Sequence, residues 1–122
     1  MNKQIKDCNI KELKLSCLDI LTISTVELRQ KITPEDLKIL TDSLADDLVK
    51  YFPKLYINDI KESFKRGVRF SDEFHINVKT YFKWIKNYRQ LLWDAQYEVH
   101  TLNKPIKEVP LYRAPKKLIS NG

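Results

Sequence analysis

NVKTYFKWIKNYRQLLWDAQYEVH, residues 77–100, is the stretch that decides the fold. It holds six aromatic and four basic side chains and contains neither glycine nor proline. Projected at about 100° per residue, its apolar side chains fall into one broad sector, and Lys79, Lys83 and Lys86 fall on the other side. The pattern predicts one long helix with an apolar face and a basic face, and Asn77 is placed to cap its start.

The apolar face of this predicted helix contains the side chains expected in the core. They are Val78, Tyr81, Ile85, Tyr88, Leu92, Ala95 and Val99, with Trp84, Leu91 and Phe82 at the margins. Arg89 projects to the edge of this sector, so its guanidinium has to extend to solvent or find a partner. Most of the rings are expected to fill the core, whereas Trp93 and Tyr97 project toward the lysine side and are better candidates for exposed contacts.

Upstream, residues 33–36 (TPED) form the clearest helix start in the chain. A hydroxyl cap is followed by proline at the first helical position and by acids that suit the positive end of a helix. The predicted helix covers residues 34–52 and ends at Pro53. Its apolar stripe is Leu37, Leu40, Leu44, Leu48 and Tyr51.

The N-terminal third contains one amphipathic segment at residues 9–21. Its apolar stripe is Ile10, Leu13, Cys17, Ile20 and Leu21. A short second helix is expected from Thr25 to Lys31, with the Ser24 hydroxyl as its N-cap.

Two further segments precede the long helix. A short helix is expected over residues 58–66, with Ile60 and Phe64 facing inward and Gly67 taking the left-handed C′ conformation that ends it. Apolar side chains then recur at intervals of two and four in residues 68–76, which favours a brief extended loop or a β-bridge.

The composition agrees with a helical fold, because only two glycines occur in 122 residues and hairpins depend on glycine. The chain is therefore predicted to be all-α: a small bundle of four to five helices with a long C-terminal helix. Residues 1–100 are expected to form this domain. Residues 101–122, with three prolines and scattered lysines, are expected to form an extended basic tail.

The formal net charge is +6, which favours an anionic partner. Residues 101–122 carry five of the cations against one glutamate, a net charge of +4. This tail is a candidate arm for nucleic acid through Arg113, Lys116 and Lys117, or a peptide that docks on a partner through Leu111 and Tyr112. A tail without a binding role is the third interpretation.

The lysines of the long helix are the second candidate surface. Lys79, Lys83 and Lys86 form a stripe, and Arg66 and Arg69 lie upstream, close to Lys61 and Lys65. Clustered positive charge of this kind contacts phosphate backbones. The alternative is a solvated helix face, because lysine is common on exposed helix surfaces.

No pattern in the chain indicates catalysis, a metal or a cofactor. Cys8 and Cys17 lack the spacing of a zinc site, and His75 and His100 have no nucleophile or carboxylate patterned around them. The acids of the 34–52 helix lack the alternation of a calcium loop, and no phosphate-binding or dinucleotide motif occurs. The chain is therefore expected not to be an enzyme.

The N-terminal residues 1–17 break their apolar positions with charges every few residues. This pattern is typical neither of a signal peptide nor of a membrane span. We therefore expect a cytosolic protein with reduced thiols and no membrane association.

Residues 44–90 resemble small helical proteins encoded by phages and mobile elements of bacteria, some of which look like replicative helicase loaders or inhibitors. Their recurring elements are a helix ending near "YFP", a helix with an aromatic residue before glycine, and "LN" followed by "TF..W(I/L)..Y". The matching residues in this chain are Tyr51, Phe52, Pro53, Ile60, Phe64, Gly67, Asn77, Thr80, Phe82, Trp84, Ile85 and Tyr88. The resemblance implies a protein that binds other proteins and DNA without an enzymatic site.

The expected function is a non-enzymatic accessory role in phage or mobile-element DNA replication. The partner would be DNA or an acidic protein, for example a replicative helicase, held by the basic helix face and the C-terminal arm. The alternative is a structural or assembly component of a phage particle, whose arm contacts a neighbouring subunit in the virion. The oligomeric state and any strand preference stay open.

Overall fold

Four α-helices and one short 3-10 helix make up the computed structural model, which describes residues 2–102 of the chain. They are η1 (Ile5–Asp7), α1 (Ile10–Leu28), α2 (Pro34–Tyr51), α3 (Ile57–Phe70) and α4 (Val78–Leu102). The described residues divide into a helical core up to Leu91 and a second unit from Leu92 onward, each described by itself. The all-α prediction is confirmed, and residues 103–122, which contain most of the predicted tail, lie outside the described range.

Helix α1 is longer than predicted, because the two expected N-terminal helices are one. It begins with a capping box in which the Glu12 amide donates to Asn9 Oδ1 (2.8 Å) and the Asn9 amide donates to the Glu12 carboxylate (3.1 Å). The predicted cap, Ser24, is buried inside the helix. The Thr25 hydroxyl donates to the Thr22 carbonyl (3.1 Å), so its polar group is satisfied without a helix break.

Helix α2 begins where the sequence predicts and ends one residue earlier than predicted. The Thr33 hydroxyl accepts a hydrogen bond from the Asp36 amide (3.1 Å), and Pro34 occupies the first turn. The helix ends at Tyr51, two residues before Pro53. Of the predicted stripe, Leu40, Leu44 and Leu48 are buried, Leu37 is half-buried and Tyr51 is exposed.

The predicted end of α3 at Gly67 is wrong. The helix continues to Phe70, Gly67 is an internal residue without a positive φ angle, and Ser71 is the C-cap. Ile60 and Phe64 are buried as predicted. Gly67 is required for helix packing rather than for helix termination, as described with the α3–α4 groove below.

The predicted extended segment over residues 68–76 is also wrong in its first part. Residues 68–70 belong to α3, and within the described residues the only β-bridge joins Gln4 to Tyr56. Asn77 caps α4 as predicted, because its side-chain oxygen accepts the Thr80 amide (2.9 Å).

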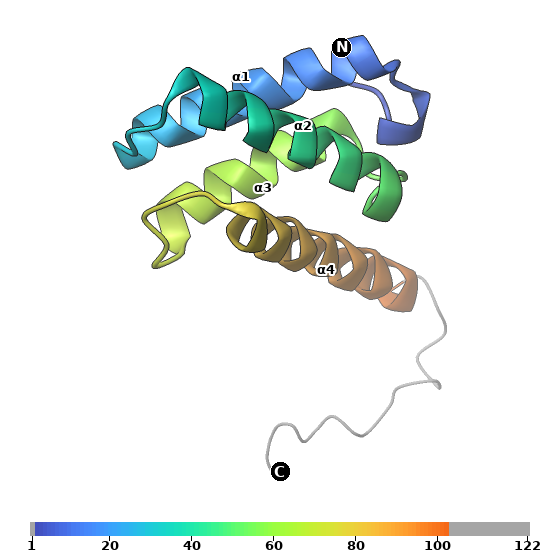
Figure 1. Ribbon diagram of the computed structural model, residues 1–122. Helices are drawn as coiled ribbons and strands as arrows, with labels where there is room; N and C mark the ends of the chain where they lie inside the picture. Colours follow the sequence, from blue (N-terminus) through green and yellow to red (C-terminus); the bar gives the residue numbers. More distant parts are fainter. Residues whose placement is uncertain (1, 103–122) are drawn as a thin grey trace. The chain divides into compact units, whose positions relative to one another are not determined.

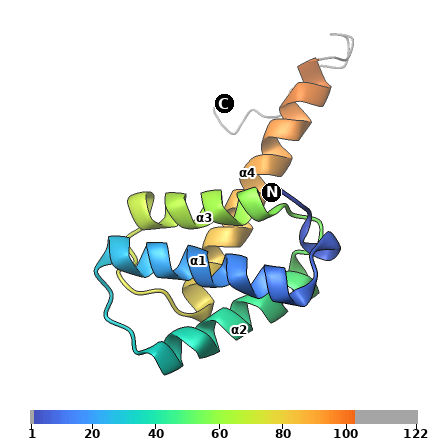
Figure 2. The same cartoon turned by 90° about the horizontal axis from the view of Figure 1, so that it is seen from above.

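Helix α1 lies between α2 and α3 and contacts both (Figure 1 and Figure 2). Backbone hydrogen bonds join the N-terminal segment to the turn between α2 and α3. The Ile5 amide donates to the Leu55 carbonyl (2.8 Å), and the Lys3 carbonyl accepts the Ile57 amide (2.9 Å). This arrangement brings Ile5 into the core, where it is fully buried.

The first turns of α4 complete the core. Tyr81, Trp84 and Ile85 are buried, and Phe82 is half-buried against the Tyr51 and Phe52 rings, with centroids 5.2 and 5.3 Å apart. The other main buried apolar side chains are Leu13, Cys17, Ile20, Leu21, Leu40, Leu44, Ala45, Leu48, Ile57, Ile60, Phe64 and Ile76. Burial raises the pKa of Cys17 to about 12, so its thiol stays protonated at neutral pH.

The predicted apolar face of α4 is correct only for residues 81–88, near the start of the helix. Val78 and Leu91 are exposed, and in the second unit Leu92 is half-buried and Ala95 exposed. Arg89 is half-buried, and its guanidinium lies over the Phe52 ring at 4.9 Å. Of the two alternatives predicted for Arg89, extension to solvent or a partner, the structure shows a partner.

A partly buried hydrogen bond links α4 to α2. The Tyr81 ring is fully buried, and its hydroxyl donates to Asp47 Oδ2 (2.5 Å). Burial, and then the hydrogen bond to Asp47, raise the pKa of Tyr81 well above its usual value of 10.0. The neutral phenol is therefore the form that the folded protein stabilises.

Replacing Tyr81 by phenylalanine should lower the free energy of unfolding by about 1 to 2 kcal/mol, because Asp47 loses its donor. The raised pKa adds a pH dependence: its stabilising effect is present below pH 10 and declines above it, since only the unfolded chain releases the proton there. Chemical denaturation at pH 7 and at alkaline pH measures both effects. If the wild type and Tyr81→Phe lost the same free energy of unfolding at alkaline pH, the pH dependence would not come from Tyr81.

Candidate binding surface at the α3–α4 turn

The three lysines predicted to bind lie on the exposed side of α4. Lys79, Lys83 and Lys86 follow one another at intervals of four and three, and all are exposed, so they share one helix face. We call them the basic face of α4. Lys83 also forms an ion pair with Glu73 in the turn before the helix, at 2.8 Å. The predicted exposure is confirmed, and the binding role stays a prediction.

The two predicted arginines lie in the last turns of α3. Arg69 makes an ion pair with Glu27 of α1, with one N···O distance of 3.3 Å. Arg66 places its guanidinium 5.6 Å from the centre of the Phe70 ring. Because Arg69 and Lys83 already have acidic neighbours, Arg66, Lys79 and Lys86 are the cations of this set with no carboxylate partner among the described side chains.

Two exposed phenyl rings accompany these cations. Phe70 ends α3 and is 75% exposed, and Phe74 lies in the following turn and is 73% exposed. Burial of a ring of this size stabilises a protein by about 2 kcal/mol, so two exposed rings four residues apart indicate a contact surface. Sequence reasoning placed both rings in an extended segment. The sequence signal that could have identified Phe70 is its position directly after Arg69 and four residues after Arg66.

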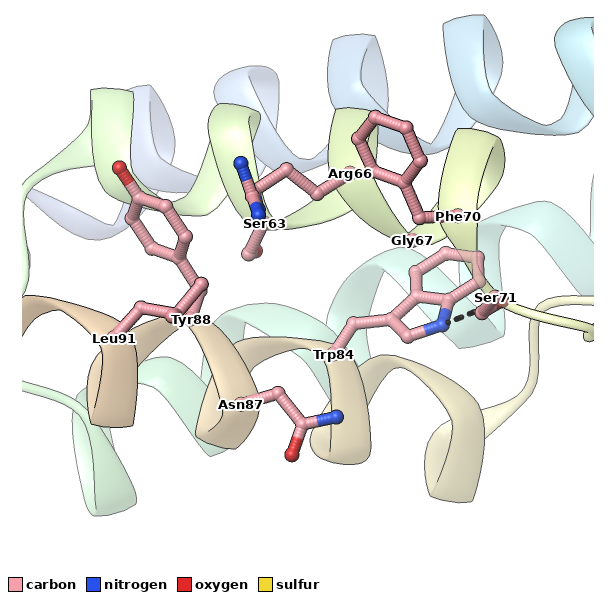
Figure 3. Close-up of a pocket in the computed structure, with 9 residues that line it drawn as sticks. All are labelled: Ser63, Arg66, Gly67, Phe70, Ser71, Trp84, Asn87, Tyr88 and Leu91. Atoms are coloured by element: carbon pink, nitrogen blue, oxygen red, sulfur yellow. Dashed lines mark hydrogen bonds between the residues drawn. The ribbon is translucent and has the colours of Figure 1, made fainter.

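A groove of about 300 Å³ runs between α3 and α4 next to this turn (Figure 3). The Trp84 indole forms its floor, and its Nε1 donates to the Ser71 hydroxyl at 3.2 Å. Arg66 and Phe70 line the groove from α3, and Asn87 lines it from α4. The remaining lining residues are Ser63, Gly67, Tyr88 and Leu91.

Gly67 allows the close approach of the two helices at this groove. A Cβ atom at position 67 would overlap the carbon atoms of the Trp84 indole. The indole also meets the Phe64 ring edge-on, with centroids 5.7 Å apart. The absence of a side chain at residue 67 therefore positions Trp84, and with it the wall of the groove.

Charged side chains of α3 act on Tyr88 in the groove. Burial, and then Asp59 and Glu62, raise the pKa of Tyr88, whereas Arg66 lowers it. Arg66 is the charged residue among those that line the groove, so it is the group that would attract an anion there.

The predicted tail residues are not among the residues that the structure describes. Arg113, Lys116 and Lys117, and the docking residues Leu111 and Tyr112, lie outside the described residues. Trp93 and Tyr97 belong to the second unit and are exposed, as predicted. The candidate surface is therefore defined by Arg66, Arg69, Phe70, Phe74 and the basic face of α4, and we call it the turn surface.

Among residues 2–102, no group of three or more histidine, cysteine, aspartate or glutamate side chains is placed to hold a metal ion. None of the helices in that range is both long enough and apolar enough to cross a bilayer.

Comparison with known proteins adds no relative: no family model, no curated protein and no solved structure matches the chain significantly.

Proposed function

We propose that this protein is a non-enzymatic accessory protein of phage or mobile-element DNA replication that binds nucleic acid, or an acidic replication protein, through the turn surface. The observation that supports the proposal is the set of exposed cations and exposed rings that residues 66–86 carry. Arg66, Lys79 and Lys86 have no described carboxylate partner, Phe70 and Phe74 are mostly exposed, and the Arg66 guanidinium lies 5.6 Å from the centre of the Phe70 ring.

Each kind of side chain has a role in such binding. Lysine and arginine contact phosphates without regard to sequence, and binding releases condensed counterions. Exposed aromatic rings stack on unpaired bases, each contributing about 1 to 3 kcal/mol. Lys83 and Arg69 form solvent-exposed ion pairs, which are weak, so both can exchange their glutamate partners for a phosphate.

The resemblance to phage and mobile-element proteins supports the cellular role in this proposal. Most of the residues that carry it are core residues, including Phe52, Phe64, Thr80, Trp84 and Ile85. They determine how α2, α3 and α4 pack, and that packing positions the turn surface. A replicative helicase is the acidic-partner candidate that the resemblance suggests.

A salt titration tests the nucleic-acid part of the proposal. Fluorescence anisotropy with labelled single-stranded and double-stranded DNA measures the binding constant at each salt concentration. The logarithm of the binding constant should fall linearly with the logarithm of the salt concentration. The slope should be about −0.7 to −0.9 for each phosphate contact. An affinity that does not change with salt would remove the phosphate-contact mechanism.

The alternative, a phage assembly role through the C-terminal arm, depends on residues 103–122. Deleting these residues and measuring mass by light scattering separates the two functions. An unchanged oligomer with altered DNA binding supports the replication role, whereas loss of a larger assembly supports the assembly role.

A further inference from the structure

A second groove lies on another part of the helical core, between α1 and α2. It has a volume of about 420 Å³. Its lining residues are Lys11, Lys14, Leu15, Leu18, Pro34, Leu37, Lys38 and Thr41. None of these residues belongs to the turn surface, so the groove needs its own explanation.

The floor of the α1–α2 groove is apolar. Leu15 and Leu18 of α1 are exposed, and Leu37 of α2 is half-buried beside them. The Thr41 hydroxyl donates to the Leu37 carbonyl at 2.7 Å, so its hydrogen-bonding group is already satisfied. The floor therefore offers hydrocarbon surface that water solvates poorly.

Helix α1 is apolar on more of its circumference than core packing requires. Leu13, Cys17 and Leu21 face the core, while Leu15 and Leu18 lie on an outer face. A helix with apolar residues on most sides normally buries them all. The outer leucines are therefore a candidate contact for another molecule.

The rim of the groove is basic. Lys11, Lys14 and Lys38 are the charged residues that line it. Lys14 and Lys38 both approach the Asp42 carboxylate, at 3.4 and 3.1 Å, and the hydrogen bond from Lys38 is the main cause of the lowered pKa of Asp42. Counting three lysines against this one aspartate leaves a net charge of +2 around an apolar floor.

We infer that the α1–α2 groove docks an acidic amphipathic helix of a partner protein. The apolar side chains of that helix would cover Leu15, Leu18 and Leu37, and its carboxylates would pair with Lys11, Lys14 and Lys38. The charge of the rim selects the acidic partner, because carboxylates flanking the apolar stripe would meet lysines on both sides of the groove.

The shape of the groove fits a helix. Residues 11–18 of α1 span about two helical turns, roughly 10 Å, which accommodates apolar residues at i, i+3, i+4 and i+7 of a docked helix. The groove is bounded by two helices, so it has no strand edge to which an extended peptide could add.

The test uses the full-length chain and two fluorescein-labelled helical peptides of about four turns each. Both peptides carry leucines at i, i+3, i+4 and i+7, and the flanking positions are glutamate in one and lysine in the other. We expect saturable binding of the acidic peptide and a Kd at least about tenfold higher for the basic one, because three rim pairs are lost.

Matched variants assign the binding to the groove. Leu15 and Ile23 lie on the same helix and are 58% and 59% exposed, but only Leu15 lines the groove. Leu15→Glu should raise the Kd for the acidic peptide about tenfold or more, and Ile23→Glu should leave it unchanged. Both substitutions are at exposed positions, and circular dichroism checks that both variants stay folded.

Several outcomes would overturn the inference. They are no saturable binding of the acidic peptide, equal binding of both peptides, or equal effects of Leu15→Glu and Ile23→Glu. Self-association of the wild type that Leu15→Glu abolishes would also overturn it, since the groove would then hold a second copy of this chain.

Discussion

Replacing Gly67 by alanine should lower the free energy of unfolding by about 1 to 3 kcal/mol, because a Cβ atom there overlaps the Trp84 indole. A loss of stability is the opposite of what this substitution normally does. Replacing an internal helix glycine that has no close neighbour by alanine normally stabilises the protein, by up to about 1 kcal/mol. Gly67 has no positive φ angle, so backbone strain adds nothing. Thermal and urea denaturation of Gly67→Ala measure the effect.

A double-mutant cycle assigns this effect to the indole. Trp84→Leu alone should be destabilising, because it removes the ring contact with Phe64 and the hydrogen bond to Ser71. In the Trp84→Leu background, however, Gly67→Ala should be neutral or slightly stabilising, because the overlapping ring is gone. A destabilisation by Gly67→Ala of equal size in both backgrounds would show that the α3–α4 contact is not its cause.

Aspartate at Ile85 or Leu44 should unfold the core. Both side chains are completely buried, and an unpaired charge in an apolar interior costs several kcal/mol, comparable to the whole stability of a small protein. The far-ultraviolet circular dichroism of either variant should lack a cooperative thermal transition.

The matched control for Ile85→Asp is Lys86→Glu, one residue further along α4. Lys86 is exposed, so its charge reversal should change the free energy of unfolding by no more than about 0.5 kcal/mol. Similar melting of Ile85→Asp and Lys86→Glu would mean that the inward and outward faces of α4 are assigned wrongly.

The sequence was sufficient to predict features that depend on residues close together in the chain, such as helix caps and helix faces. The hydroxyl of Thr33 and the side chain of Asn77 cap α2 and α4 as predicted. The predicted inward positions of Tyr81 and Ile85 are also correct. Caps and helical periodicity depend on residues three or four apart, which a single sequence displays directly.

Gly67 shows what local patterns miss. A glycine after a helical segment favours a C-cap, but the function of Gly67 depends on Trp84, 17 positions later and in another helix. Similarly, the hydroxyl residues of α1 suggest a helix start, yet the Thr25 hydroxyl is satisfied within the helix. These features depend on partners whose positions follow only from the three-dimensional arrangement.

The sequence predicted the exposure of the lysines of the turn surface but not the exposure of its two phenyl rings. Lys79, Lys83 and Lys86 are exposed as the helical projection indicates. The spacing of Phe70 and Phe74 favoured an extended segment, whereas Phe70 belongs to the longer α3 and both rings are exposed.

Two doubly substituted variants of the full-length chain test the central claim, that the turn surface binds nucleic acid, most directly. Lys79→Glu/Lys86→Glu changes the basic face of α4, and Lys31→Glu/Lys54→Glu makes the same change in net charge at other exposed positions. The first variant should weaken single-stranded DNA binding about tenfold or more and make the salt slope shallower by about 1.5, since two phosphate contacts are lost. The second variant should keep the wild-type slope. Equal slopes for both variants would contradict the claim.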